Sequence, residues 1–246
     1  MFLKYVDTGD IILFTCRGSS FNFLGPHLTR TVTNSPFDHI AIILRFGDQV
    51  KDLYILEAVG DKGVRIASWY TLRCELYEEG FFEKLVTRKL LYDMTPEKLT
   101  DLDIFRRNVV GKSYGLTATK LLFDQPSEVQ FDNQCTRESQ HHANIGQDRR
   151  FFCSELIAKA FKVLEVMKNP EKGSNNYFPG SFGLHCKIEN ELRDEVAMGP
   201  PINILLNSDT PLRKDSDLQQ QRHSVGTPQI VSNARGTSSG ASKANA

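Results

Sequence analysis

Five short apolar runs between residues 10 and 91 are the feature of the sequence that most constrains its fold. Each run is rich in Ile, Leu and Val, and turn-forming residues such as Gly and Asp lie between the runs, which is the pattern of β-strands joined by turns. In chain order the runs are DIILF, HIAIILRF, LYILEAV, GVRIAS and EKLVTRKLL. We therefore expect these runs to form a sheet.

Two helical patterns follow the strand signals. The segment 95–110, TPEKLTDLDIFRRNVV, opens with a Thr-Pro-Glu start signal, and the segment 153–167, CSELIAKAFKVLEVM, stops before Asn169 and Pro170. The second segment also keeps its apolar residues on one helical face. The fold class that we predict is α+β, with a mostly antiparallel sheet packed on helices.

The composition indicates one main domain. A chain of 246 residues with 40% hydrophobic residues can form one substantial core, which we place at residues 1–206. Within this domain the segment 124–150 is polar and aperiodic, so we expect a long loop, and loops of that length are often functional. Residues 207–246 contain almost no large apolar side chain, so we expect a disordered polar tail.

The charges of the chain balance. Thirty basic and thirty acidic residues give a formal net charge of zero, so no overall field attracts nucleic acid, and any peripheral membrane contact must be local. The N-terminus, MFLKYVDTGD, lacks the apolar core of a signal peptide, and no later run approaches the roughly 20 apolar residues of a spanning helix. We expect a cytoplasmic protein that does not bind nucleic acid. The sequence does not indicate an oligomeric state.

The cysteines are scattered and lack CxxC spacing. They are Cys16, Cys74, Cys135, Cys153 and Cys186. This pattern disfavours a disulfide framework and structural zinc, so most of them should be free thiols. A zinc site built from Cys135, His141, His142 and Cys153 is disfavoured, because the loop offers neither regular spacing nor a second cysteine pair. We expect no metal and no cofactor.

The motif GKSYG, from Gly111 to Gly115, ends like a phosphate-binding loop. That loop requires a glycine at the position of Arg106 and a preceding strand, whereas a helical pattern precedes the motif here. We therefore interpret the motif as a helix terminator.

Two ionisable side chains, His39 and Glu57, interrupt the apolar faces of neighbouring predicted strands. At a period of two, the residues that share these faces are Phe37, Ala41 and Ile43 for the histidine, and Leu53, Ile55 and Val59 for the glutamate. A hairpin that turns near Gln49 brings His39 opposite or diagonal to Glu57. A carboxylate bound to one ring nitrogen fixes the tautomer and leaves the other nitrogen free as a base.

Cys153, in RRFFCSELIAKAF, is the candidate nucleophile that such a base would serve. It lies in the first turn of a predicted helix, where unpaired N–H groups and the helix dipole favour a thiolate. The predicted loop 124–150 ends just before it, so we expect the loop to lie over or beside the thiol and to gate access.

Each of the three residues also has a purely structural interpretation. Cys153 is in phase with the apolar face of its helix, as an inert buried cysteine would be. His39 alone fits a satisfied core histidine, and Glu57 alone fits an acid that pairs with Lys62 or Arg65 on the next strand. Their occurrence together favours the catalytic interpretation.

The order of the blocks GDIILF, FDHIAII, LEAVGDKGV and FCSELIAKAF resembles the circularly permuted branch of the NlpC-type papain-fold superfamily. The resemblance is specifically to YiiX-like amidases and related orthopoxvirus proteins, and it covers about residues 8–182 in sparse motifs. It implies a permuted papain-like fold in which Cys153 is the nucleophile, His39 the base and Glu57 the orienting residue. Lecithin:retinol acyltransferase relatives are similar in order, but their strand partner is usually a second histidine.

These roles predict a thiol hydrolase or amidase, or an acyltransferase, that cleaves an amide or ester bond through an acyl-thioester on Cys153. The backbone N–H of Cys153 would stabilise the oxyanion. The apolar segment SSFNFLGPHLTRTV favours a lipid or acyl amide as substrate. The alternatives are a peptidase acting on short peptides or isopeptides, and a non-catalytic ligand-binding module.

Overall fold

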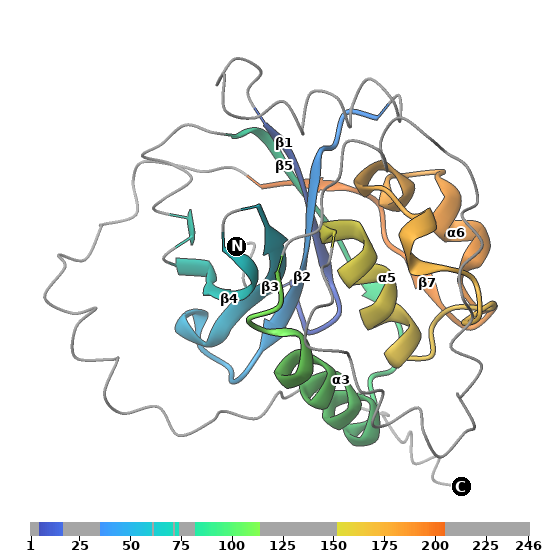
Figure 1. The fold of residues 1–246 in the computed structure, drawn as a ribbon, viewed down its shortest axis with the longest axis horizontal. Helices are drawn as coiled ribbons and strands as arrows, with labels where there is room; N and C mark the ends of the chain where they lie inside the picture. Colours follow the sequence, from blue (N-terminus) through green and yellow to red (C-terminus); the bar gives the residue numbers. More distant parts are fainter. Residues whose placement is uncertain are drawn as a thin grey trace, which may run out of the picture.

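The computed structural model describes residues 5–16, 35–60, 62–70, 72–73, 82–113 and 152–204. In these parts of the chain, six strands form one sheet in the order β4-β3-β2-β1-β5-β8, and every neighbouring pair is antiparallel. A separate antiparallel pair joins β6 and β7. The described fold is therefore α+β with a mainly antiparallel sheet, as predicted (Figure 1).

The strands form where the apolar runs predicted them. The first four are β1 (Ile11–Cys16), β2 (His39–Arg45), β3 (Leu53–Val59) and β4 (Gly63–Ser68). The fifth run, predicted as one strand, forms two: β5 (Phe82–Arg88) in the large sheet and β6 (Leu90–Leu91) in the small one. The short strands β7 (Ala197–Met198) and β8 (Ile202–Asn203) then pair with β6 and β5, respectively.

Apolar side chains pack on both faces of the large sheet. One cluster contains Ile42 of β2 together with residues of two helices, α3 (Pro96–Val109) and α5 (Cys153–Val163). The other cluster contains Ile43 of β2 and the buried Trp69. Successive residues of β2 enter opposite clusters, which explains the continuous apolar run from Ile40 to Leu44. Figure 1 shows α5 alongside β2, and α5 also packs against β3.

The helix α3 begins and ends at its sequence signals. The hydroxyl of Thr95 accepts a hydrogen bond from the N–H of Lys98 at 3.3 Å, and Pro96 occupies the first helical position. The helix ends at Val109, and Gly111 adopts a left-handed backbone with φ of 85°. The described part of the GKSYG motif is therefore a helix terminator, as interpreted from the sequence.

The helix α5 is shorter than its apolar pattern predicted. It ends at Val163 rather than just before Asn169, because Glu165 adopts a left-handed φ of 56°. The N–H of Val166 then bonds to the carbonyl oxygen of Phe161 at 3.1 Å, as in a Schellman motif. Val166 is buried because the chain turns back onto the core, so its apolar character was misread as a continuation of the helix.

Short helices make up most of the remaining described structure. They are η2 (Val50–Asp52) between β2 and β3, and η4 (Ser174–Asn176), η5 (Pro179–Phe182) and α6 (Lys187–Glu191) after α5. The connection through η2 forms the hairpin expected between β2 and β3. The elements after α5 add Phe182 and Ile188 to the cluster that contains α3 and α5.

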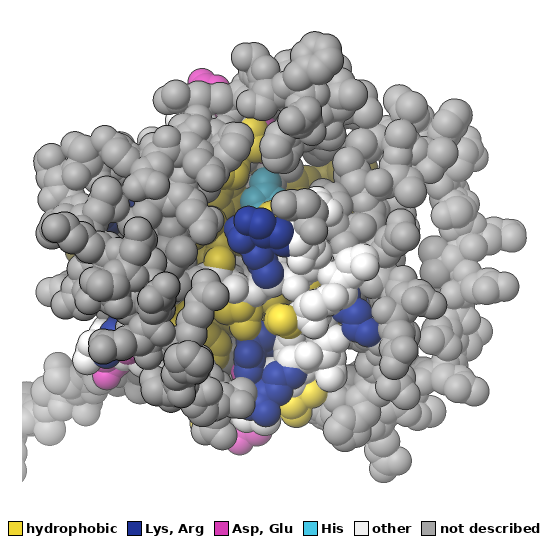
Figure 2. All heavy atoms as spheres, turned by 60° about the vertical axis from the view of Figure 1, so that its left-hand side comes forward, with side chains coloured by type: hydrophobic (Ala, Val, Ile, Leu, Met, Phe, Trp, Pro, Cys, Tyr) yellow, Lys and Arg dark blue, Asp and Glu magenta, His cyan; other side chains and the backbone are white. Residues whose placement is uncertain are grey.

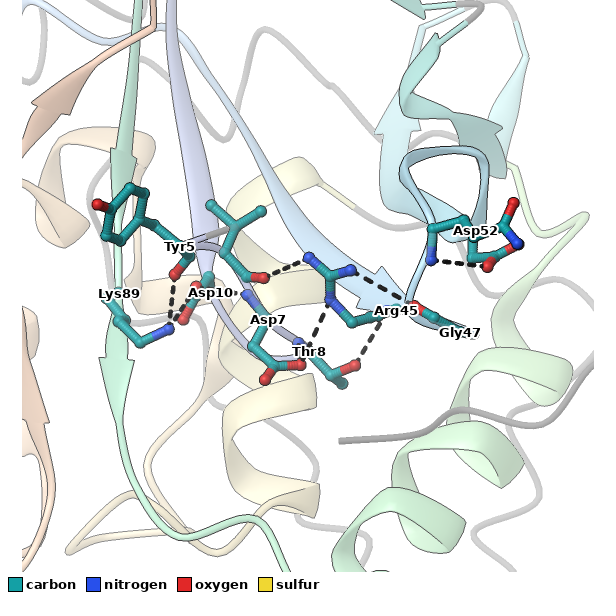
Figure 3. A network of polar contacts seen from close by, with 10 residues as sticks. Tyr5, Asp7, Thr8, Asp10, Arg45, Gly47, Asp52 and Lys89 are labelled. Atoms are coloured by element: carbon teal, nitrogen blue, oxygen red, sulfur yellow. Dashed lines mark hydrogen bonds and ion pairs between the residues drawn. The ribbon is translucent and has the colours of Figure 1, made fainter. Parts of the chain in front are cut away.

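A polar network joins the residues before β1 to the end of β2 and the junction of β5 and β6 (Figure 3). The buried guanidinium of Arg45 donates to the carbonyl oxygen of Val6 at 2.7 Å. The carboxylate of Asp10 is buried and accepts from the N–H groups of Asp7 and Leu90, both at 2.8 Å. These contacts fix the start of β1 against both of its neighbouring strands.

We expect Asp10 to make stability depend on pH. Burial raises the pKa of Asp10 from 3.8 to about 6, although Lys89 and the two N–H groups act in the opposite direction. Between these two values the folded state binds more protons than the unfolded state, so the contribution of Asp10 to stability falls as the pH rises.

Asp10→Asn removes this titration. Urea titrations give the difference in unfolding free energy between the wild type and the variant at each pH. This difference, wild type minus variant, should fall by about 3 kcal/mol between about pH 3 and pH 7. A difference that does not change with pH would contradict the assignment.

A buried arginine attaches the segment after α5 to the sheet. Arg88 on β5 is fully buried, and its guanidinium donates to the carbonyl oxygens of Phe182 at 2.9 Å, Gly183 at 2.6 Å and Gly199 at 2.9 Å. It also pairs with the carboxylate of Glu189 at 2.5 Å. A buried guanidinium is tolerated only when its donors are satisfied, so the cation and these carbonyl groups hold each other in place.

Arg88→Met should destabilise the protein strongly, because it leaves the carbonyl groups and Glu189 without their donor. We expect the free energy of unfolding in urea to fall by about 3–5 kcal/mol. The matched control is Arg193→Met, since that side chain is 47% exposed and pairs with the exposed Glu195. It should change stability by less than about 0.5 kcal/mol. Equal losses in the two variants would show that Arg88 has no special role.

Some predictions lie outside the described residues. The loop at 124–150 and the tail at 207–246 are among them, and the single domain at 1–206 likewise stays a prediction. None of the helices within the described ranges has the length and apolar character needed to cross a membrane.

Candidate active site

The carboxylate of Glu57 and the imidazole of His39 meet across the β2–β3 pair. The register places Ile42 opposite Leu56, and continuing it puts His39 diagonal to Glu57, one of the two positions expected from the hairpin. His39 Nε2 lies 2.9 Å from Glu57 Oε2, which is hydrogen-bond distance. The two ionisable groups on these apolar strands therefore pair with each other.

Glu57 is buried, with 3% of its side chain exposed, and each of its oxygens has a cationic partner. Oε2 binds His39, while Oε1 accepts a hydrogen bond from Nε of Arg65 at 2.8 Å and forms an ion pair with Nη2 at 2.7 Å. Burial acts to raise the pKa of Glu57, but the hydrogen bonds and charges of His39 and Arg65 outweigh it and lower the pKa below 4.5. Glu57 is therefore ionised at neutral pH.

The imidazole of His39 lies between Glu57 and Cys153. Burial acts to lower the pKa of His39, but hydrogen bonds to Cys153 and Glu57 and their negative charges raise it from 6.5 to about 10. Because Nε2 binds Glu57, Nδ1 is the nitrogen left for Cys153. The ring also packs on Phe14, with 5.1 Å between the ring centroids. At neutral pH the site therefore favours an imidazolium beside the ionised carboxylate of Glu57.

Cys153 is the first residue of α5 and is buried, with 3% of the residue exposed. Phe152 precedes it as the N-cap and provides no side-chain hydrogen bond to the helix. The hydroxyl of Ser154 donates to the carbonyl oxygen of Tyr177 at 2.6 Å, which ties the start of the helix to the segment after it. The positive end of the helix dipole, without a capping side chain, therefore lies at the sulfur.

The structure thus brings together the three site residues predicted from the sequence, but one neighbour was misplaced. Phe37 was expected on the face of His39 with Ala41 and Ile43. It packs instead in the cluster that contains α5, whereas Ala41 and Ile43 lie in the opposite cluster. Because β2 begins at His39, Phe37 precedes the strand and the alternation of strand side chains does not extend to it.

Arg65 is the part of the site that the sequence offered only as an alternative. It was considered as a partner that would explain Glu57 without His39, yet in the structure both cations bind Glu57 at once. A signal for this contact existed, because the short β3–β4 hairpin puts Arg65 directly opposite Glu57. Lys62, the other alternative, lies near the turn and is exposed.

One end of the site faces the outside of the protein. Figure 2 shows a histidine side chain bordered by hydrophobic side chains and by a Lys or Arg side chain. The side chains of His39 and Arg65 are 14% and 24% exposed, while Glu57 is almost fully buried.

A thiol, an imidazole and a carboxylate in contact can carry out nucleophilic chemistry. A thiolate paired with an imidazolium attacks electrophilic carbon, and the imidazolium then supplies a proton to the leaving group. The carboxylate holds the ring and balances its charge.

No group of three or more His, Cys, Asp and Glu side chains within the described ranges is arranged to hold a metal ion. The disfavoured zinc alternative involves Cys135, His141 and His142, which lie outside these ranges. The expectation that the protein uses no metal and no cofactor therefore stays a prediction. Among the described cysteines, Cys16, Cys153 and Cys186 are not disulfide-bonded, as expected.

Comparison with known proteins gives a distant structural likeness. No family model and no curated protein sequence matches the chain. A solved structure described as the metalloprotein yiiX from Escherichia coli O157:H7, DUF1105, has 18% identity and a TM-score of 0.42 and covers 81% of this chain and 96% of its own. The name of that protein is the one to which the order of the sequence blocks was likened, and the match does not test the papain-like part of that resemblance. At this TM-score it carries no argument about activity or metal content.

Alkylation tests whether Cys153 is activated. At about pH 6, where an ordinary thiol is mostly protonated, Cys153 should react with iodoacetamide at least about ten-fold faster than Cys186. The reason is its pairing with the imidazolium of His39, which Cys186 lacks among its described contacts. In His39→Ala the Cys153 rate should fall to that of Cys186, as followed by peptide mass spectrometry. Equal rates in the wild type would contradict activation.

Proposed function

We propose that the protein is a cysteine-dependent hydrolase or acyltransferase, which cleaves an amide or ester bond through an acyl-thioester on Cys153. The observation that carries the proposal is the double contact of His39, with Glu57 on one side and Cys153 on the other. The position of Cys153 at the first residue of α5 supports it independently.

The first step is attack of the Cys153 thiolate on the carbonyl carbon of the substrate. A carbon–sulfur bond forms, and negative charge develops on the carbonyl oxygen. The backbone N–H of Cys153, at the uncapped start of α5, is suited to stabilise that oxyanion. His39 then gives its proton to the leaving amine or alcohol as the carbon–heteroatom bond breaks.

The second step transfers the acyl group away from sulfur. Neutral His39 accepts a proton from the incoming nucleophile, which attacks the thioester and regenerates the thiolate–imidazolium pair. Water as nucleophile gives hydrolysis, whereas an amine or an alcohol gives transfer. Glu57 orients the ring and balances its charge throughout.

The proposal includes a permuted papain-like arrangement of the NlpC type. Histidine and its carboxylate partner on adjacent strands precede, in the chain, the cysteine at a helix start, and the sheet that carries them is antiparallel. This order, together with the sequence blocks around the three residues, supports the assignment.

The substrate that we favour is a lipid or another acyl amide or ester. The support is the apolar segment SSFNFLGPHLTRTV ahead of His39 in the sequence. A peptidase acting on short peptides or isopeptides would use the same chemistry. A non-catalytic ligand-binding module is less favoured, because three ionisable residues are paired within the core at the cost of their hydration.

Turnover of a substrate panel distinguishes these functions. The panel should contain acyl amides, lipid esters and dipeptides, each followed by product mass spectrometry. Cys153→Ala should abolish turnover, and His39→Ala should lower it by about 10²–10⁴-fold, since the proton transfers are lost. Glu57→Gln keeps a hydrogen-bonding group without the charge, so it should reduce the rate less than His39→Ala does.

The matched control is Cys186→Ala, which should leave the rate unchanged because Cys186 contacts neither His39 nor Glu57 in the structure. Wild-type turnover in the Cys153 variant would overturn the proposed function.

A further inference from the structure

We propose that Arg65 is a positioning residue of this site, which holds Glu57 in the orientation in which its Oε2 binds His39. The inference rests on the proposed function, because it extends the same chain of contacts by one member. Three adjacent strands each supply one residue of this series of contacts: His39 from β2, Glu57 from β3 and Arg65 from β4. The series begins at Arg65 and ends at Cys153, at the start of α5.

The contact geometry gives Arg65 control over the carboxylate. Both Nε and Nη2 of Arg65 point to the same oxygen, Oε1 of Glu57, at 2.8 Å and 2.7 Å. The terminal torsion of a glutamate is soft, so a carboxylate with one partner can rotate. The charge-assisted hydrogen bond from Nε and the ion-pair contact of Nη2 oppose that rotation. With Oε1 held, Oε2 is the oxygen that remains for His39 at 2.9 Å.

The backbone next to Arg65 is itself fixed, although β4 is an edge strand. The N–H of Val64 donates to the carbonyl oxygen of Lys112 at 2.7 Å, and the N–H of Gly111 donates to the carbonyl oxygen of Val64 at 2.8 Å. Gly63 has a left-handed φ of 67°, and a Cβ there would lie 2.3 Å from the Lys112 oxygen. The segment after α3 therefore anchors β4 directly beside Arg65.

Burial makes the second cation necessary. Glu57 has 3% of its side chain exposed, so water cannot replace a lost partner on Oε1. Within the described residues, His39 and Arg65 are the titratable groups that act on this carboxylate. Arginine suits the role because it stays charged at every relevant pH and presents its donors in a fixed fork.

The test follows the hydrogen bond between His39 and Glu57 by NMR as the pH is lowered. The Nε2–H proton of His39 gives a resonance that persists while the carboxylate is ionised, and His39→Ala identifies it by its absence. In the wild type the resonance should survive to below about pH 4.5, because the pKa of Glu57 is lowered. In Arg65→Met it should be lost at least about one pH unit higher, since one cationic partner is missing.

Two further variants keep the test decisive. Arg65→Lys retains the charge but not the contact through two nitrogens. The pH at which the resonance is lost should therefore rise, but by less than in Arg65→Met. Arg65→Lys serves as the test if Arg65→Met does not fold. Arg193→Met, the exposed matched substitution, should leave the midpoint pH at which the resonance is lost at its wild-type value. A purely structural Arg65 would lower thermal stability without moving the midpoint, and an unmoved midpoint in either folded Arg65 variant overturns the inference.

Alkylation of Cys153 in the wild type separates this inference from the proposed function. If Cys153 reacts no faster than Cys186, the proposed function fails, whatever the NMR result. If Cys153 is activated and the midpoint does not move in the Arg65 variants, the inference alone fails.

Discussion

A carboxylate that is 3% exposed has to be paired, and the arrangement of the site follows from this requirement at Glu57. Glu57 lies on β3 and takes one partner from each neighbouring strand, so both strand pairs must be in register for the charge to be compensated. A slip of one residue in β3 would turn the carboxylate to the other face of the sheet, into the cluster that packs on α5. The alternating apolar side chains resist the same slip, because they fill one cluster on each face. Packing and electrostatics therefore specify one register together.

The same pairing determines the protonation state of the site. Burial alone would make both His39 and Glu57 neutral, since desolvation acts against the charged form of each. Contact reverses this, because an imidazolium next to a carboxylate loses less on burial than either charge does alone. Arg65 extends this pairing at one end, and the contact of His39 with Cys153 extends it at the other. Charges that are paired in this way can be buried where a single charge cannot.

Much of this could be predicted from the sequence, and the parts that could not have identifiable causes. The strands and the start of α3 follow from local signals, namely short apolar runs and a Thr-Pro cap. The pairing of His39 with Glu57 could be predicted because the position of the hairpin turn determines which residues of the two strands lie opposite each other. The end of α5 was misjudged, because Val166 is buried by a turn of the chain rather than by the helix. The role of Arg88 could not be predicted, because its partners lie about a hundred residues away in the sequence and are backbone carbonyl groups. Every residue has such a group, so no residue type indicates the contact.

Under the proposed function, the chain of charges also explains how one imidazole could serve as acid and then as base. In the free enzyme, Cys153 and Glu57 both raise the pKa of His39, so the proton rests on the ring. Formation of the carbon–sulfur bond takes the negative charge off the sulfur and so removes one of these two causes. The imidazolium therefore becomes more acidic at the stage when the leaving group needs a proton. Once that proton has been transferred, the ring is neutral beside a thioester and can accept a proton from the incoming nucleophile. Glu57, held by Arg65 on its other oxygen, keeps the ring oriented through both steps, so the change in proton affinity comes from the sulfur alone.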